Sequence, residues 1–433
     1  MTLHDTLAKL GQRQLLAGIE HLHPLELQEF HTKLKTYDSD LISRQKHLLL
    51  KDQDVSDVLP YQKHSSSSNP DDRLLGEEMV RQGKVGCLIL AGGQGTRLGF
   101  DGPKGLFPVT PIRNKSLFQL FCERTLAAGP SLPLCIMTSP INHDQTIAFF
   151  NEHDNFGLDN VTFIQQGMLP FVDDRGNWLL EKPGKIAEGP DGNGHALNLF
   201  FKERIWEKWK ASGVEYLNVI FVDNPLADPF DAEFAAFTMR THADVAIKAV
   251  QRLSPDEKMG VLAERNGKLQ VIEYSELPKD ASAFTLSYTG MLCFSMDFIQ
   301  RLQSFQMPLH LARKTAKILL GTSKGHCQEQ VQVWKCETFL FDVLQAAAAT
   351  SVLLCPRDKI YAPLKNASGD RSITTVKQAL QSFDHEVYNA LTGRKAEVDA
   401  FELDPAFYYP SPSLKEKLRT HALREGEYVC SLL

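Results

Sequence analysis

The sequence predicts an α/β protein whose central sheet is mostly parallel. Short apolar runs typical of buried strands recur at residues 85–90, 134–138, 161–165, 217–222 and 245–250. Segments with helical character lie between them, at residues 116–128, 196–210 and 232–242. Because parallel strands need a crossover between them, this alternation favours helices packed against a parallel sheet. Further strands are expected at residues 260–263, 269–274 and 289–294, near the ligand side.

Length and composition indicate a globular protein with more than one domain. The chain has 433 residues, of which 43% are hydrophobic and 23% charged, and one compact core rarely holds so many. The formal net charge of -6 argues against a basic surface for nucleic acid or anionic lipid. We therefore expect no nucleic-acid or membrane partner, and any phosphate site must be a local group of donors.

The cysteines and the N-terminal residues favour a cytoplasmic protein. The start of the sequence lacks the basic, apolar and small-residue order of a secretory signal, and no run of 18 apolar residues occurs. The eight cysteines are scattered without a CxxC pair, and several lie inside apolar runs. This pattern favours buried thiols in a reducing compartment over disulfides or zinc.

Changes in composition and hydrophobic pattern along the chain predict three consecutive domains. Apolar residues at helical spacing extend to about residue 50 and are followed by a polar loop, HSSSSNPDD, at residues 64–72. We expect a helical N-terminal subdomain at residues 1–75, a central domain at 76–350 and a small C-terminal domain at 351–433. The N-terminal subdomain carries no pattern that points to chemistry.

A glycine-rich segment, LILAGGQGTRLGFDGPKG, begins inside the first predicted strand and spans residues 88–105. Glycines leave backbone N–H groups open to a phosphate and permit positive φ in a concave turn. Arg97 and Lys104 supply cationic donors within reach of the same anion. Because parallel sheets bind nucleotides at the carboxyl ends of their strands, this segment is a candidate phosphate-binding loop.

Other interpretations of the glycines fit less well. A Walker A loop requires GK[ST] at its end, and this loop continues GTRLG. The dinucleotide fingerprint GxGxxG is only approximated, because Leu98 fills its third glycine position and the next strand ends in Thr138-Ser139 without an acidic residue. A nicotinamide-dependent dehydrogenase therefore lacks both the spacing and the ribose-binding acid. A purely structural turn does not need three close glycines and two cations.

A second candidate lies at the end of a later strand, in VIFVDNPLADP. Asp223 follows this strand directly, so its carboxylate should face the ligand crevice. Hard oxygen ligands suit Mg²⁺, which binds through one or two carboxylates together with substrate phosphates. The sequence thus predicts Mg²⁺ at Asp223, and an Asx turn that ends the strand is the alternative.

Several segments resemble one enzyme family. The pattern LxxGxGTxLGxxxPK resembles the signature of eukaryotic-type UTP:sugar-1-phosphate uridylyltransferases, and LAGGQGTRLG most resembles their UDP-N-acetylhexosamine pyrophosphorylases. The segments FIQQGMLP, EGPDGNGHAL, MGVLAERNGKLQVIEYSEL, WKCETFLFD and YAPLKNASGD follow in the family's order, so the resemblance covers most of residues 75–370. It implies a Rossmann-like, GT-A-like nucleotidyltransferase fold and transfer of a uridylyl group from UTP to a sugar 1-phosphate.

The resemblance also implies a role for each matching residue. The implied catalytic cations are Arg97, Lys104 and Lys365, and the implied metal ligand is Asp223. The implied UTP contacts are Leu90, Ala91, Gly92, Gly93, Gly95, Thr96, Gln166, Gly192 and Lys335. The implied sugar contacts are Asn193, Gly260, Glu273, Tyr274, Phe339 and Phe341. Without the resemblance, PDGNG is equally a helix-capping turn, the two phenylalanines are typical of a core, and His195 is structural.

One position departs from the acetamidosugar pattern. Relatives with that specificity carry AGN after the sugar-binding strand, whereas this sequence has Tyr288-Thr289-Gly290-Met291. The thioether of Met291 cannot supply the polar contact of an asparagine. The PDGNG turn nevertheless favours N-acetylglucosamine 1-phosphate, since the UDP-glucose enzymes usually carry a PPGHGD-like turn. Glucose 1-phosphate is the alternative substrate, and a non-catalytic nucleotide-sugar-binding protein is a distant one.

Overall fold

The structure is a computed structural model that describes residues 1–37, 39–50, 57–278, 280–322 and 325–431. The chain forms two compact units that interleave along the sequence. The smaller unit comprises Met1–Asp54, Gln166–His195 and Gln306–Asp342, and the larger comprises Val55–Gln165, Ala196–Phe305 and Val343–Leu433. The three predicted domains, 1–75, 76–350 and 351–433, stay a prediction.

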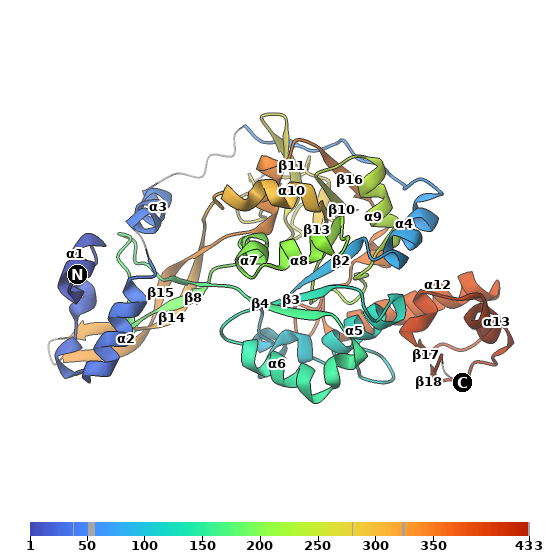
Figure 1. Cartoon of the computed structure of the whole chain (residues 1–433), viewed down its shortest axis with the longest axis horizontal. Helices are drawn as coiled ribbons and strands as arrows, with labels where there is room; N and C mark the ends of the chain where they lie inside the picture. Colours follow the sequence, from blue (N-terminus) through green and yellow to red (C-terminus); the bar gives the residue numbers. More distant parts are fainter. Residues whose placement is uncertain (38, 51–56, 279, 323–324, 432–433) are drawn as a thin grey trace. The chain divides into compact units, whose positions relative to one another are not determined.

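A mixed sheet is the centre of the larger unit (Figure 1). The described residues give it ten strands, with the main order β1-β11-β13-β9-β2-β3-β4. Neighbours β9, β2, β3 and β4 are parallel, as are β10 and β16, whereas β13 runs antiparallel to β9 and β10. The predicted fold class is therefore confirmed. The strands are β1 (Leu59–Pro60), β2 (Val85–Leu90), β3 (Leu134–Thr138), β4 (Val161–Gln165), β9 (Tyr216–Phe221), β10 (Val245–Gln251), β11 (Val261–Arg265), β12 (Lys268–Ile272), β13 (Leu286–Ser295) and β16 (Thr350–Leu354).

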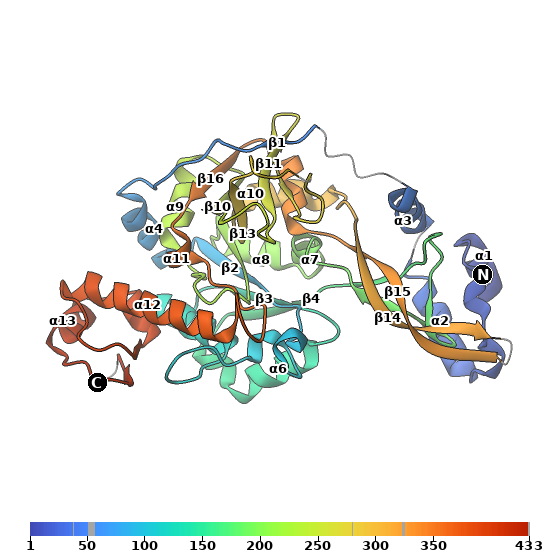
Figure 2. The ribbon, with the colours of Figure 1, turned by 180° about the vertical axis from the view of Figure 1, so that it is seen from behind.

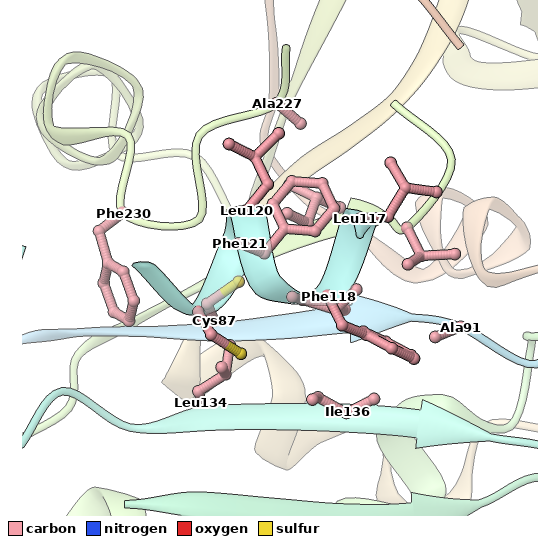
Figure 3. Close-up of a cluster of buried hydrophobic side chains, with 14 of the residues drawn as sticks. Cys87, Ala91, Leu117, Phe118, Leu120, Phe121, Leu134, Ile136, Ala227 and Phe230 are labelled. Atoms are coloured by element: carbon pink, nitrogen blue, oxygen red, sulfur yellow. The ribbon is translucent and has the colours of Figure 1, made fainter. Parts of the chain in front are cut away.

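Helices cover both faces of the parallel strands, which explains why β2 and β3 are apolar throughout. Figure 3 shows Phe118 and Phe121 of α5 (Leu117–Ala128) against Cys87 of β2 and Leu134 of β3, and all four are fully buried. On the other face Gly86 leaves room for α8 (Ile205–Ala211), because an added Cβ would lie 2.5 Å from the ring of Trp209. Burying each large side chain contributes about 1.5–3 kcal/mol.

The helical stretches predicted at residues 196–210 and 232–242 are confirmed. The first of them forms two helices, because Arg204 has φ 57° and separates α7 from α8. A left-handed residue interrupts the i to i−4 hydrogen bonds of a helix. The helices of the larger unit also include α4 (Asp72–Arg81), α6 (His143–Glu152), α7 (Ala196–Lys202), α9 (Ala232–Arg240), α10 (Met296–Arg301) and α11 (Arg357–Ile360).

The strand register brings three loops to one edge of the sheet. Leu90, the last residue of β2, pairs with Phe221 of β9 and with Met137 of β3. All three strands run in the same direction, so the chain leaves them at the same edge. The glycine-rich loop after Leu90, Asp223 after β9 and the turn after β3 therefore start side by side.

The C-terminal part of the larger unit has its own apolar cluster (Figure 2). It contains α12 (Ile373–Thr392), β17 (Phe401–Leu403), α13 (Pro412–Thr420) and β18 (Glu427–Val429), with β17 and β18 parallel. Asp384 of α12 is 1% exposed and accepts hydrogen bonds from the Tyr408 hydroxyl at 2.6 Å and the Leu403 N–H at 3.3 Å. Its burial outweighs these bonds and raises the pKa of the carboxyl to about 7.

The smaller unit combines the N-terminal helices with short hairpins. Its helices are α1 (Leu3–Lys9), α2 (Pro24–Leu34) and α3 (Ser39–Leu50), as the helical spacing predicts. Buried Gln45 joins α3 to the hairpins, since its Oε1 accepts from Trp178 Nε1 at 2.8 Å and its Nε2 donates to the Pro170 carbonyl at 3.3 Å. The strands are β5 (Met168–Pro170), β6 (Leu180–Lys182), β7 (Lys185–Ile186), β8 (Glu188–Pro190), β14 (His310–Thr322) and β15 (Gly325–Glu337).

None of the described helices combines the length and the apolar character that crossing a bilayer demands.

The raised pKa of Asp384 predicts a pH dependence of stability. Between about pH 4 and pH 7 the folded state keeps a proton that the unfolded state has lost, so stability should fall as pH rises through this window. Asp384→Asn should flatten that part of the curve of Tm against pH, because the amide has no proton to lose. Asp297→Asn, at an exposed side chain, is the control and should leave the slope unchanged. An unchanged slope in Asp384→Asn would contradict the assignment.

Candidate functional site

The glycine-rich loop closes on itself at the end of β2. Gly95 N–H donates to the Gly102 carbonyl at 2.9 Å, and Lys104 N–H donates to the Gly93 carbonyl at 3.1 Å. Gly95 must be glycine, because an added Cβ would lie 2.8 Å from the Phe100 ring, whereas Gly93 faces open space. The backbone at Gly93 is thus exposed, and the loop places Lys104 at the edge formed by the carboxyl ends of the parallel strands.

Two lysines from distant segments meet one carboxylate at this edge. Lys365 Nζ lies 2.5 Å and Lys104 Nζ lies 3.5 Å from Oδ2 of Asp223, which is 8% exposed. Lys104 also donates to the Leu364 carbonyl at 3.4 Å. The predicted catalytic lysines and the predicted metal ligand therefore form one cluster.

Burial and neighbouring charges act against each other in this cluster. Burial alone would raise the pKa of Asp223, but Lys365 and Lys104 outweigh it and hold the pKa below its ordinary value. Burial is also the largest effect on Lys104 and lowers its pKa, while Asp223 opposes the shift and the charges of Lys365 and Arg97 add to it. Arg97 itself is exposed and, in the part of the chain that the structure describes, no carboxylate pairs with it. Three positive charges thus lie near a single negative one.

Asn224, directly after Asp223, holds the segment that carries Lys365. Its Nδ2 donates to the Ile360 carbonyl at 2.8 Å, and its Oδ1 accepts from Ala362 N–H at 3.0 Å. Leu364 N–H donates to the Asp223 carbonyl at 2.7 Å. This segment, residues 360–365, is therefore tied to the residues after β9 by two bonds of the Asn224 side chain and one backbone bond.

Two predicted sugar-contact residues, Gly260 just before β11 and Glu273 just after β12, are close to each other. An added Cβ at Gly260 would lie 3.4 Å from Oε1 of Glu273 and 3.0 Å from Val271. Gly260 also accepts a hydrogen bond from Tyr288 N–H at 2.8 Å. Tyr274 is 48% exposed. A side chain at residue 260 would be tight against Val271, whereas the Glu273 carboxylate lies at ordinary contact distance.

Met291 belongs to the core. It is 4% exposed and lies in the same buried apolar cluster as Ile220 and Val222 of the neighbouring β9 segment. Gly290 before it has φ 84°, and an added Cβ would lie 2.4 Å from the Phe221 ring. The thioether of Met291 thus packs among apolar side chains, an environment that does not suit the side-chain amide of an asparagine.

The smaller unit gathers a second set of predicted residues around Thr338. Gly192 has φ 88°, and an added Cβ would lie 2.2 Å from the Thr338 carbonyl oxygen. Thr338 N–H donates to the Asp191 carbonyl at 2.8 Å, and Leu340 N–H donates to Oδ1 of Asn193 at 2.8 Å. The PDGNG turn and the segment of Lys335 and Phe339 are therefore joined. Gln166 is 7% exposed, and the residue after it, Gly167, accepts from Asp191 N–H at 3.1 Å.

Asp191 is an unusual carboxylate in this turn. It is 7% exposed, and its Oδ1 is buried without a hydrogen-bond partner among the described residues. Burial raises its pKa to about 6, and the charge of Lys335 opposes that rise. Lys335 itself pairs with Glu337, with Nζ and Oε1 2.5 Å apart.

The two predicted aromatic residues stack on each other. The ring centroids of Phe339 and Phe341 are 5.0 Å apart at an interplanar angle of 22°. His310 lies 4.9 Å from the Phe339 ring, and its Nε2 is 2.9 Å from Oδ2 of Asp342. These residues form an aromatic group with a polar pair at its side.

The predicted residues thus form two sets. The larger unit holds the glycine loop, Arg97, Lys104, Asp223 and Lys365 together, and Gly260 and Glu273 as a pair. The smaller unit holds Gln166, Gly192, Asn193, Lys335, Phe339 and Phe341. Sequence patterns do not reveal Asn224 or Asp191 as site residues, because their roles depend on backbone partners far along the chain.

Known proteins resemble this chain over most of its length. A family model described as UTP–glucose-1-phosphate uridylyltransferase matches residues 28–410. UDP-N-acetylglucosamine diphosphorylase 2 of Arabidopsis thaliana is 34% identical over 68% of this chain and 64% of its own length. The human UDP-N-acetylhexosamine pyrophosphorylase-like protein 1 is 35% identical over 73% of this chain and 68% of its own.

Among solved structures, the uridine diphosphate N-acetylglucosamine pyrophosphorylase of Trypanosoma brucei superposes with a TM-score of 0.80. The match covers 99% of this chain and 98% of that one at 24% identity, and shows that the two share a fold. With the family model matched over residues 28–410, the chain belongs to the UTP–glucose-1-phosphate uridylyltransferase family.

Proposed function

We propose that this protein transfers a uridylyl group from UTP to a sugar 1-phosphate, with N-acetylglucosamine 1-phosphate as the preferred acceptor. The observation that carries the proposal is the meeting of Lys104 and Lys365 at Asp223, beside the open backbone of the glycine loop. The relatives named for UDP-N-acetylglucosamine or UDP-N-acetylhexosamine support the choice of sugar. The eight scattered cysteines support a cytoplasmic location.

The reaction joins two anions, so positive charge is the main requirement. An oxygen of the sugar 1-phosphate attacks the α-phosphorus of UTP; the new P–O bond forms as the bond to the β-phosphate breaks and pyrophosphate leaves. A phosphate dianion is already a nucleophile near neutral pH, so no general base is needed. Arg97, Lys104 and Lys365 hold the phosphates together and neutralise charge in the transition state.

Mg²⁺ is part of this proposal. The described residues contain no group of three or more His, Cys, Asp or Glu side chains that would hold a metal by themselves. Asp223 nevertheless offers one carboxylate, and Mg²⁺ commonly binds one or two carboxylates together with substrate phosphates. The donor set therefore fits a metal that arrives with the nucleotide, where it would neutralise phosphate charge.

Glucose 1-phosphate is the second candidate acceptor. The family model is described by that substrate, and Met291 stands where acetamidosugar relatives carry an asparagine. Because Met291 is buried in the apolar cluster, residue 291 offers no polar contact to either sugar.

Pyrophosphate release should be measured with UTP, Mg²⁺ and each sugar phosphate. We expect turnover with both UTP and Mg²⁺ present, a higher kcat/KM for N-acetylglucosamine 1-phosphate than for glucose 1-phosphate, and loss of activity on addition of EDTA. A preference for glucose 1-phosphate would establish the second candidate. No release with either sugar would contradict the proposed class of reaction.

Removing a cation from the cluster should slow turnover without unfolding the protein. Lys104→Ala, Lys365→Ala and Arg97→Ala should each lower kcat/KM by roughly 30- to 1,000-fold, since one such contact stabilises the transition state by about 2–4 kcal/mol. Lys359→Ala is the matched control, because Lys359 lies in the neighbouring helix and pairs at the surface with Glu386. Near-normal rates for all three site variants, with unchanged circular dichroism, would show that the site lies elsewhere.

Restoring the asparagine of acetamidosugar relatives should damage the core. Met291→Asn buries an amide among apolar side chains, so we expect a stability loss of about 1–3 kcal/mol and a lower Tm. We also expect no gain in kcat/KM for N-acetylglucosamine 1-phosphate, whereas Met291→Leu should be nearly neutral. An improved kcat/KM at an unchanged Tm would show that residue 291 faces the sugar.

A further inference from the structure

Buried Asn142 connects the turn after β3 to the glycine-rich loop after β2. It is 1% exposed and stands before the first residue of α6. Its Nδ2 donates to the Ala91 carbonyl at 2.9 Å and to the Gly93 carbonyl at 3.2 Å. Both acceptors belong to the segment that the proposed function assigns to the phosphates of UTP.

The hydrogen bonds fix which way the Asn142 amide points. Its Oδ1 accepts from the Ser139 N–H at 2.8 Å and from the Ser139 hydroxyl at 3.1 Å. A backbone N–H only donates and a backbone carbonyl only accepts. The oxygen of Asn142 must therefore face Ser139, and its NH₂ group must face the loop.

This amide determines the direction of two peptide groups. In a planar trans peptide the carbonyl of one residue and the N–H of the next point in opposite directions. Because the carbonyls of Ala91 and Gly93 both point to Asn142, the N–H groups of Gly92 and Gln94 both point away from it. These two alternate N–H groups therefore lie on the same side of the loop, where both can donate to one anion.

The backbone donors of this loop are not used within the protein. Within the described ranges, no protein acceptor takes a hydrogen bond from the N–H of Gly92, Gly93 or Gln94. Gly93 also has nothing within 4 Å of the position of an added Cβ. The loop is thus held from one side and open on the other, where an anion has room to approach.

We propose that Asn142 is a positioning residue that sets the phosphate-binding amides of the glycine loop before UTP binds. The proposal rests on the proposed function, because it names the residue that orders the UTP site of that reaction. Without this amide, the peptide group after Ala91 would lose the bond that fixes it, and the peptide group after Gly93 would keep only the bond from Lys104 N–H at 3.1 Å. Binding UTP would then have to order this part of the loop.

The test compares UTP affinity in two matched asparagine variants. Asn142→Asp keeps the shape of the side chain and the oxygen that accepts from Ser139. It replaces the NH₂ donor by a second oxygen, which cannot donate to the two loop carbonyls. Asn218→Asp is the control, since Asn218 is 2% exposed and its Nδ2 also donates to two carbonyls, those of Asp228 at 2.9 Å and Pro229 at 3.0 Å. Both variants should lose Tm to a similar extent.

Calorimetric titration with UTP should separate positioning from stability. We expect Asn142→Asp to raise the Kd for UTP about tenfold or more, as the loss of two hydrogen bonds suggests. The KM for the sugar 1-phosphate should stay within about twofold of wild type, a split that a general loss of structure would not produce. Asn218→Asp should leave both constants near wild type.

Two further measurements keep the proposal open to refutation. If Asn142→Asp does not fold, Asn142→Ser, which retains one donor, should bind UTP more tightly than Asn142→Ala. At low pH the Kd of Asn142→Asp for UTP should approach the wild-type Kd, because the introduced carboxyl regains a donor when it is protonated.

The outcomes are distinct. UTP affinity in the Asn142 variants equal to wild type, or reduced no more than in Asn218→Asp, would overturn the positioning role and leave the proposed function standing. A wild-type protein that does not bind UTP would overturn both.

Discussion

The in-register pairing of β3, β2 and β9 is the constraint on which the candidate site depends. Leu90 and Phe221, the last residues of β2 and β9, pair with each other, and Leu90 pairs with Met137, one residue before the end of β3. Their hydrogen bonds therefore bring the turn of Asn142, the glycine loop and Asp223 to one edge, although they come from separate parts of the chain. A slip of one strand by one residue would move its loop outward from or inward to this edge and turn each of its side chains to the opposite face of the sheet.

The positive charge at this edge is partly offset by one carboxylate. The protein carries a net charge of -6, yet Lys104 and Lys365 both lie within ion-pair distance of the buried Asp223 carboxylate. Half-buried ammonium groups repel each other and are costly to desolvate, and the carboxylate offsets part of that cost. Asp223 thus holds two cations together at the edge of the sheet.

Much of the fold could be predicted from local patterns. Apolar runs located β2 and β3 with their observed limits, because strands buried on both faces are apolar throughout. The run at the partly buried β4 also has the observed limits. The break between α7 and α8 could not be predicted this way, since the residues around Arg204 are ordinary helix formers and the left-handed φ of that residue follows from its surroundings. For the site, the glycines, lysines and Asp223 were recognisable by type and order, and the partners that hold them were not.

The sequence by itself determined the chemical inventory of this protein: a glycine loop with two cations, a carboxylate at a strand end, and the order of segments that identifies its family. Each depends on residue types close together in the chain. Only the tertiary structure decided which residues hold these groups in position and bring them together. The amide of Asn142 reaches Ala91 across 51 residues and Lys365 reaches Asp223 across 142. Such contacts arise from strand pairing and burial over the whole sheet. A local sequence pattern therefore cannot predict them.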